Sequence, residues 1–254
     1  MKTDEVMCVL VVTSENFPKE NELKEKLIKE FPSIKTIVKN INKKNTNVIL
    51  GDKNIVIYGS GYITDKLGEY KFNISANSFY QINPVQTEKL YNLAIEGANL
   101  SKDDTVFDLY CGIGTIGIFV AKYAKKVYGI EIVEEAIKDA KKNAKLNQID
   151  NIEFIAGDVE KLLDKLIYDK KIKPDVVFVD PPRKGLDTNT IENLLKIKPK
   201  KIVYISCNPA TLIRDLSKLE EKYDINKITP VDLFPYTSHV EVCALLELKN
   251  HQPS

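Results

Sequence analysis

The feature that most constrains the fold lies within residues 105–131, where two short apolar runs flank a glycine turn and an apolar-periodic segment. The first run ends in Asp108 and predicts a buried strand, and Gly112 and Gly114 follow it. Glycines at such a junction let the backbone turn sharply and approach a ligand without a Cβ in the way. The second run ends at Glu131, whose carboxylate can accept hydrogen bonds from ribose hydroxyls. The stretch therefore predicts a strand–turn–helix–strand unit that binds an adenosine-containing cofactor.

The glycine spacing leaves the type of cofactor open. Gly117 follows Gly114 by three residues, as the third glycine of a dinucleotide-binding fingerprint would. A nicotinamide dinucleotide and S-adenosylmethionine are both compatible with this turn, and the motifs further along the chain must decide between them.

Composition describes an ordinary globular chain. It has 254 residues and a formal net charge of +1, which gives room for one α/β domain with a smaller appendage and does not by itself indicate nucleic acid binding. No apolar run approaches the ~18 residues of a membrane span, and the first residues lack a signal-peptide core. The four cysteines show neither metal spacing nor a disulfide framework, so no metal site is expected. We therefore expect free thiols and a cytoplasmic location.

The pattern of apolar residues changes after residue 75. Residues 1–75 predict a small α+β subdomain, in which one helix over 20–31 accompanies short β-like runs at 34–41, 47–50 and 55–58. Residues 76–254 alternate strands with helices and end in two runs, 225–234 and 240–248, that are expected to pair antiparallel. The fold class is therefore α/β, with a Rossmann-like sheet typical of S-adenosylmethionine-dependent methyltransferases preceded by the small α+β subdomain.

Polar residues follow several of the predicted parallel strands. Sites in open α/β sheets lie outside the carboxyl ends of the strands, so these residues should gather along one edge. They are Tyr110, Glu131, Asp158, Asp180 and Cys207. Asp158 could accept a hydrogen bond from an adenine amino group or cap the following helix, and the two roles are compatible.

Cys207 is the sharpest candidate for a nucleophile. Asn208 and Pro209 predict a helix that begins immediately after it, and the amino end of a helix favours a thiolate. A lone cysteine at a strand end is more often a small buried hydrophobic residue. Cys111 is the rival, but it lies inside the glycine turn.

Asp180-Pro-Pro-Arg183 follows a continuous apolar run. Two successive prolines stiffen the loop and fix the aspartate at the strand tip. Enzymes that methylate exocyclic amines usually carry an aromatic residue where this chain has Arg183, which argues against that activity. Arg183 could bind a phosphate or pair with an acid, and the sequence alone leaves both open.

Glu241 lies at the start of the last apolar run, after Phe234-Pro-Tyr-Thr-Ser and His239-Val240. A carboxylate in such a strand could be a base with a raised pKa. The alternation of the strand favours an outward-facing residue instead.

Taken together, these motifs resemble the RNA 5-methyluridine (uracil-5) methyltransferase family. The resemblance covers residues 76–249 and rests on five stretches in the same order. They are Ser78-Phe-Tyr-Gln-Ile-Asn83, Phe107-Asp-Leu-Tyr-Cys-Gly-Ile-Gly114, Asp180-Pro-Pro-Arg-Lys-Gly185, Tyr204-Ile-Ser-Cys-Asn-Pro209 with Thr211 and Arg214-Asp215, and Phe234-Pro-Tyr-Thr-Ser-His-Val-Glu241. The subdomain of residues 1–75 is similar, more weakly, to the small central subdomain of that family.

The resemblance implies S-adenosylmethionine as the methyl donor. The residues expected at its site are Gln81, Tyr110, Gly112, Thr115, Glu131, Asp158 and Asp180. It further implies that Cys207 attacks carbon 6 of uracil and that Glu241 removes the carbon-5 proton. Such a base is reachable only when it is flipped out or single-stranded, and Phe79 could then stack on it while Arg183 contacts the substrate.

Members of the family usually carry an N-terminal RNA-binding β-barrel, and many have an iron–sulfur cysteine cluster; neither is found in this sequence. The expected partner is RNA rather than DNA or a membrane, with a uridine of 23S ribosomal RNA preferred to one of transfer RNA, and the chain is expected to be monomeric. The alternatives are a transfer RNA uridine-5 methyltransferase and a non-catalytic fragment that binds S-adenosylmethionine or RNA. An RNA cytosine-5 methyltransferase would normally bring a second cysteine in a Pro-Cys element, which the sequence lacks, and a dehydrogenase would leave Cys207 and Glu241 unexplained.

Overall fold

The computed structural model describes residues 2–249, which form two compact units. The first unit extends to Tyr80 and the second begins at Gln81, so the division lies a few residues after the expected boundary between residues 75 and 76.

The first unit is a small α+β arrangement. Its elements are β1 (Val6–Val12), α1 (Glu20–Glu30), β2 (Ile34–Ile41), β3 (Lys53–Tyr58), β4 (Tyr62–Leu67) and β5 (Tyr70–Ser75). Strands β1, β2 and β3 form one sheet, in which β2 pairs parallel to β1 and antiparallel to β3, while β4 and β5 form a separate hairpin. The strand expected at 47–50 is absent, because these residues lie in the loop between β2 and β3, where Asn42 Nδ2 donates to the carbonyls of Val48 and Ile49.

The second unit contains the remaining elements. They are α2 (Pro84–Ala98), β6 (Thr105–Leu109), α3 (Thr115–Ala121), β7 (Lys126–Glu131), α4 (Glu134–Leu146), β8 (Ile152–Ala156), α5 (Val159–Asp164) continued by a π-helical turn (Lys165–Asp169), β9 (Val176–Val179), α6 (Thr188–Ile197), β10 (Lys201–Ser206), α7 (Pro209–Leu219), β11 (Tyr223–Val231) and β12 (Glu241–Leu248). Helix α2 begins where the sequence predicts, with Asn83 accepting from the N–H of Gln86 and Pro84 in the first turn.

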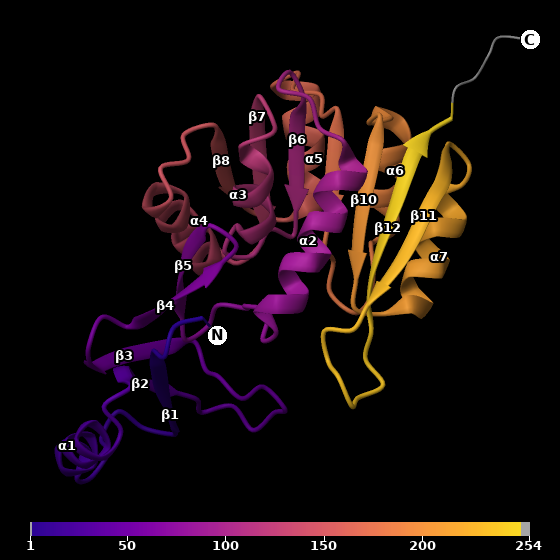
Figure 1. The fold of residues 1–254 in the computed structure, drawn as a ribbon. Coiled ribbons are helices and arrows are strands. Elements are labelled where there is room, and N and C mark those ends of the chain that lie inside the picture. Colours follow the sequence, from indigo (N-terminus) through magenta and orange to yellow (C-terminus); the bar gives the residue numbers. More distant parts are fainter. Residues whose placement is uncertain (1, 250–254) are drawn as a thin grey trace, which may run out of the picture. The chain divides into compact units, whose positions relative to one another are not determined.

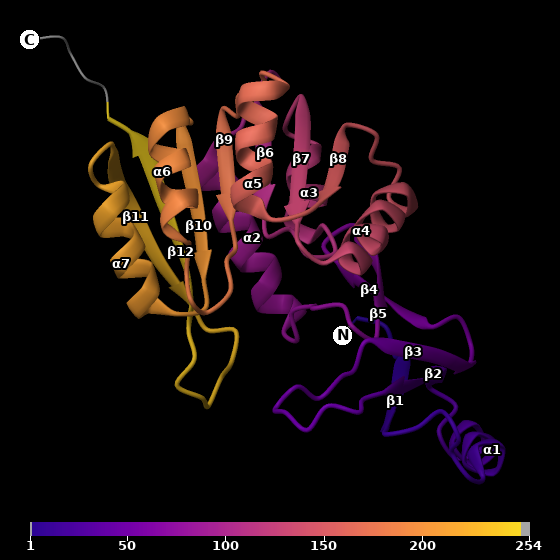
Figure 2. The ribbon, with the colours of Figure 1, turned by 180° about the vertical axis from the view of Figure 1, so that it is seen from behind.

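A seven-stranded sheet organises this unit, in the order β11-β12-β10-β9-β6-β7-β8. Strands β6 to β10 pair parallel, and β12 pairs antiparallel to both β10 and β11, as predicted for the two terminal runs. Figure 1 shows α2 in front of the sheet, whereas Figure 2, seen from behind, shows α5, α6 and α7 covering the opposite face. Helices on both faces explain why β9 is apolar throughout: all four of its residues are buried.

The carboxyl ends of the parallel strands lie at one edge of the sheet. Because β12 runs in the opposite direction, its first residue lies at this edge too. Both ribbon views show the β11–β12 loop extending beyond the same edge. The topology thus gathers residues from β6, β7, β9, β10 and β12 in one place. Within residues 2–249, no helix is long and apolar enough to span a bilayer.

Candidate active site

The turn after β6 is shaped by unusual backbone conformations. Tyr110, Gly112 and Gly114 have φ angles of 64°, 53° and 82°. The N–H of Cys111 donates to the carbonyl of Ile130 at 3.0 Å, which anchors the turn to the neighbouring strand. A Cβ added at Gly112 would meet nothing within 4 Å, whereas one added at Gly114 would lie 2.5 Å from the ring of Phe154. Gly112 therefore faces open space, and Gly114 is a packing requirement of the fold.

Glu131, the last residue of β7, accepts two backbone hydrogen bonds, one of them from this turn. One carboxylate oxygen accepts from the N–H of Gly112 at 3.2 Å, and the other accepts from the N–H of Val133 at 2.9 Å. The side chain remains partly exposed, so each oxygen keeps a lone pair for a further donor. An open backbone turn beside a carboxylate that can accept two hydroxyl donors fits the ribose of an adenosine-containing cofactor.

Asp108 lies buried beneath the turn. Its Oδ2 accepts from the N–H of Gly117 at 2.7 Å, and its Oδ1 has no hydrogen-bond partner among the described residues. Burial raises the pKa of Asp108 to about 7, although the Gly117 hydrogen bond opposes this. A Cβ at Gly117 would come within 2.9 Å of Asp108 Oδ2. The third glycine is thus required by close helix–strand packing, a role that it has in a dinucleotide-binding turn as well, so it does not distinguish the two cofactors. No role at the site was expected for Asp108 from the sequence, although a carboxylate at the end of an apolar run is a signal for one.

Cys207 and Glu241 are brought together by strand register. The antiparallel pairing of β10 with β12 ends at the pair Ser206 and Val242, and Cys207 and Glu241 are the next residues beyond it. The negative charge of Glu241 acts on the Cys207 thiol, so the two side chains lie near each other. The proposed nucleophile and base therefore lie at the ends of two neighbouring strands, which are separated in the sequence by α7 and β11.

The structure corrects the expected orientation of Glu241. Only 3% of its surface is exposed, whereas the alternation of the strand favoured an outward-facing side chain. Burial raises the pKa of Glu241 to about 7, and the positive charge of Arg183 opposes the shift. Such a pKa suits a carboxylate that must accept a proton near neutral pH.

The helix that begins after Cys207 was expected to favour its thiolate and so to lower its pKa, and this expectation is wrong. Asn208 does cap α7, since its side chain accepts from the N–H of Ala210 at 3.1 Å. The pKa of Cys207 is nevertheless raised, first by burial and then by the negative charges of Glu241 and Asp180, while its own backbone and Arg183 act in the opposite direction. Nearby carboxylates and desolvation outweigh the end of the helix.

Asp180 links the two parts of the site. It follows β9, which lies between β6 and β10 in the sheet. Burial raises its pKa to about 8, and the charges of Glu241 and Asp108 add to the shift. The pKa of Asp180 thus depends on the charges of both Asp108, beneath the glycine turn, and Glu241, near Cys207. The glycine turn and the Cys207 region therefore belong to one site.

The other predicted residues occupy the following positions. The Tyr110 hydroxyl donates to Asp187 at 3.4 Å, a long contact, and the Thr115 hydroxyl is paired with that of Tyr91 at 3.0 Å. Asp158 caps α5 by accepting from the N–H of Lys161 at 3.4 Å, as one of its two predicted roles requires. Gln81 is 9% exposed at the start of the second unit, and Phe79 is 72% exposed in the first. Roles for these residues toward a cofactor or RNA remain predictions. Among residues 2–249 no cluster of three or more potential metal ligands occurs.

Comparison with known proteins places this chain in a family. A sequence model described as tRNA (Uracil-5-)-methyltransferase matches residues 12–249. An uncharacterized RNA methyltransferase of Halalkalibacterium halodurans is 52% identical over 249 residues, which are 98% of this chain and 54% of the relative. Another, of Clostridium acetobutylicum, is 51% identical over 247 residues, 97% of this chain and 54% of the relative. The chain thus spans about half the length of the curated relatives it matches.

Solved structures agree with the fold. The tRNA (uracil-54, C5)-methyltransferase of Pyrococcus abyssi, crystallised with S-adenosyl-L-homocysteine, superposes with a TM-score of 0.74 at 32% identity, over 95% of this chain and 56% of that one. A putative S-adenosylmethionine-dependent methyltransferase of Streptococcus mutans, at 13% identity, shares the fold with a TM-score of 0.61 over 89% of this chain and 65% of that one. The predicted methyltransferase sheet is therefore confirmed. Since the family model covers nearly the whole sequence, the chain belongs to the tRNA (uracil-5-)-methyltransferase family.

Proposed function

We propose that this chain is the catalytic part of an S-adenosylmethionine-dependent RNA methyltransferase that acts on carbon 5 of a uridine. The observation that carries the proposal is the strand pairing that ends next to Cys207 and Glu241 and brings both near Asp180. A thiol, a carboxylate with a pKa near 7 and an open glycine turn at one sheet edge meet the needs of a covalent route to carbon-5 methylation.

The cofactor would lie over the Gly112 turn, with its ribose hydroxyls donating to Glu131. S-Adenosylmethionine supplies the electrophilic methyl group that carbon 5 of uracil receives. The remaining residues proposed around it are Gln81, Tyr110, Thr115, Asp158 and Asp180, and all belong to the second unit.

Cys207 performs the first step. Its sulfur adds to carbon 6 of uracil as the thiol proton passes to solvent, and the carbon 5–carbon 6 electrons move toward the carbonyl at carbon 4. Carbon 5 becomes nucleophilic and would take the methyl group as the bond from that group to the sulfonium sulfur breaks. The carboxylate of Glu241 then removes the carbon-5 proton, the double bond forms again and the Cys207 thiolate leaves. Addition and elimination divide one difficult step into easier ones.

The target we propose is a uridine of 23S ribosomal RNA, with Arg183 contacting the backbone and Phe79 stacking on a base. A uridine of transfer RNA is the second candidate, because the family model and the Pyrococcus abyssi structure both name transfer RNA. Mass mapping of 5-methyluridine in RNA from cells with and without the gene distinguishes the two: the lost modification resides in one RNA or the other.

The chemistry is tested with RNA that contains 5-fluorouridine, whose fluorine cannot be removed as a proton. In the presence of S-adenosylmethionine we expect a covalent protein–RNA complex that withstands denaturing electrophoresis. Cys207→Ala should abolish it, and Cys8→Ala, which alters a cysteine of the first unit, should leave it intact. Binding of the RNA without a complex, in the unaltered protein, would indicate a non-catalytic RNA-binding chain instead.

A further inference from the structure

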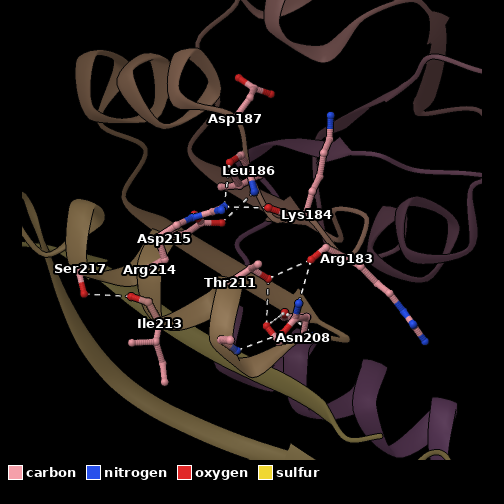
Figure 3. A network of polar contacts seen from close by, with 12 residues as sticks. Arg183, Lys184, Leu186, Asp187, Asn208, Thr211, Ile213, Arg214, Asp215 and Ser217 are labelled. Atoms are coloured by element: carbon pink, nitrogen blue, oxygen red, sulfur yellow. Dashed lines mark hydrogen bonds and ion pairs between the residues drawn. The ribbon is translucent and has the colours of Figure 1, made fainter.

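The loop that follows Asp180 is held by side chains of α7. Figure 3 shows their hydrogen bonds to the loop backbone. Asn208 Nδ2 and Thr211 Oγ1 both donate to the carbonyl of Arg183, at 3.0 and 3.2 Å. The guanidinium of Arg214 donates to the carbonyls of Lys184 and Leu186, at 2.8 and 3.3 Å. Backbone carbonyls that another loop would leave to water are thus bound by one face of a helix.

Asp215 completes this arrangement from below. It is fully buried, and its Oδ2 accepts from the N–H of Leu186 at 2.8 Å and from the hydroxyl of Tyr204 at 2.7 Å. Its Oδ1 accepts two bonds from Arg214, at 2.9 and 2.8 Å. A buried carboxylate with four donors is held in one orientation, and it holds its donors in turn.

Gly185 lies directly against Arg214 and Asp215. Its φ is +76°, and a Cβ there would come 2.5 Å from Asp215 Oδ2 and 2.6 Å from the Arg214 guanidinium. The loop therefore rests directly on Arg214 and Asp215, with no side chain between them.

Both arginines of the chain, Arg183 and Arg214, lie in this network of the loop and α7. The sequence has 37 lysines and arginines, and only Arg183 and Arg214 are arginines. Lysine would supply the same charge at either position. The planar fork of arginine can bind Asp215 with two N–H groups while it donates to the loop carbonyls, which a single ammonium group cannot do in the same geometry.

Arg183 connects the loop to the chemistry. Its carbonyl is held by α7, and its exposed side chain points away from Arg214 and Asp215 in Figure 3. Its charge opposes the upward shifts of the pKa of both Cys207 and Glu241. Helix α7 begins two residues after Cys207, so one helix fixes both the cysteine and the backbone from which Arg183 extends.

We propose that Arg214, together with Asp215, is a positioning residue that holds the loop of residues 183–186 so that the Arg183 guanidinium stays near Cys207 and Glu241. The role deepens the proposed function, since it assigns a determinant of the reactivity of the same site. Arg214 itself touches neither the cysteine nor the RNA in this account; it acts through the loop backbone.

The test follows alkylation of Cys207 by iodoacetamide against pH, with the Cys207 peptide quantified by mass spectrometry. It requires neither RNA nor S-adenosylmethionine, so it stands or falls separately from the methyl transfer. The charged groups that act on Cys207 are Glu241 on β12, Asp180 after β9 and Arg183 in the loop. The two carboxyls have pKa values of about 7 and 8, so both are ionised over the more alkaline range in which this thiol titrates.

Arg183→Ala gives the reference effect. It removes the positive charge and should lower the rate of Cys207 alkylation near neutral pH by roughly threefold, which corresponds to a rise in the thiol pKa of about half a unit. Arg214→Ala should lower the rate in the same direction, and Arg214→Lys should not restore it. In the double variant Arg183→Ala/Arg214→Ala the rate should match that of Arg183→Ala alone, because the loop then has no charge to position.

Lys218→Ala is the matched control: it removes a positive charge from the exposed side of the same helix one turn later, and the rate should not change. Urea unfolding of each variant shows that it is folded, and Thr211→Val, which deletes one bond to the loop, provides a milder second variant. An unchanged pH profile in folded Arg214→Ala, or additive effects in the double variant, would overturn the proposal.

Discussion

Two loops at the same edge of the sheet are built in different ways. Residues 110–114 follow β6 and residues 180–186 follow β9, and these strands pair parallel with Leu109 beside Val179. The first loop has its shape in its own backbone, through positive φ angles at Tyr110, Gly112 and Gly114. The second takes its shape from side chains of α7, which lies beyond it in the sequence.

The difference teaches which loop can be recognised locally. A turn made by glycines has a sequence signature, because few other residues adopt its conformation. The loop of residues 180–186 shows its prolines and Gly185 in the sequence, but not the arginine and aspartate of α7 that hold it.

The largest effect is expected within the glycine turn. Gly114→Ala combines a left-handed backbone conformation with a Cβ that would lie 2.5 Å from Phe154. Strain of ~1–2 kcal/mol and overpacking of a similar or larger size should lower the free energy of unfolding by about 2–5 kcal/mol. Gly112→Ala, where the Cβ would meet nothing within 4 Å, should cost only the backbone strain. Urea unfolding measures both, and equal losses would contradict the separate roles assigned to the two glycines.

The stability of the loop of residues 180–186 should depend on the negative charge of Asp215. Asp215→Asn keeps the size of a fully buried side chain but replaces an acceptor oxygen by a donor that must face Arg214, or Leu186 and Tyr204. We expect the free energy of unfolding to fall by about 2–4 kcal/mol. The same urea experiment measures it, with Asp150→Asn, an exposed residue between α4 and β8, as a control; a loss below about 1 kcal/mol would mean that the loop does not rely on Asp215.

Cys111 in the glycine turn and Cys207 between β10 and α7 should differ in reactivity. Burial raises the pKa of Cys111 well above its ordinary value, and Asp108 and Glu131 add to the shift, whereas Cys207 is partly exposed. In the folded protein iodoacetamide should modify Cys207 at least about tenfold faster than Cys111, since the thiolate is the reactive form and must be reached. Peptide mapping of a time course gives both rates, and comparable rates would contradict the assigned burial.

The reactivity of Cys207 should also depend on the ionisation of Glu241. The negative charge of Glu241 raises the pKa of Cys207, so Glu241→Gln should increase the alkylation rate by roughly threefold where the carboxylate is ionised. The pKa of Glu241 is about 7, so this difference should be present above that pH and shrink as the pH falls below it. A difference that grows toward low pH would contradict the sign of the coupling. Cys111 provides the internal control in the same samples.

The smallest effect is expected at the carboxylate of the glycine turn. Glu131→Gln still offers one acceptor oxygen, and the side chain is partly exposed, so the free energy of unfolding should change by less than about 1 kcal/mol. The affinity for S-adenosylmethionine, measured by calorimetry, should fall by up to about tenfold because one ribose hydroxyl loses its acceptor. A large loss of stability with unchanged affinity would reverse the roles that we assign to Glu131 and Asp215.

Much of the fold could be predicted from the sequence. The alternation of apolar runs and periodic segments after residue 105 indicates a parallel sheet, and the two terminal runs do pair antiparallel, with β12 between β10 and β11. In the first unit the run at 47–50 is not a strand, because short apolar stretches can equally occur in a loop. Strand order follows from right-handed crossovers, which leave few topologies for such a pattern.

The site was predicted in part. Cys207 was singled out by its position between a strand and a helix. Its acidity was misjudged, because the pKa depends on carboxylates from β9 and β12 that no local pattern reveals. Glu241 was assigned outward by alternation. That rule assumes one face in solvent, and here the first residue of β12 is covered.

The sequence by itself determined the glycine turn, the order of strands and helices, and the polar residues at the strand ends, because backbone preference and apolar periodicity are local properties. Only the tertiary structure decided that Glu241 lies near Cys207, that Asp108 is buried beneath the turn, and that Arg214 and Asp215 hold the loop carrying Arg183. The physical reason is that burial, register and electrostatic coupling are set by residues distant in the chain, whose contacts exist only once the sheet has formed.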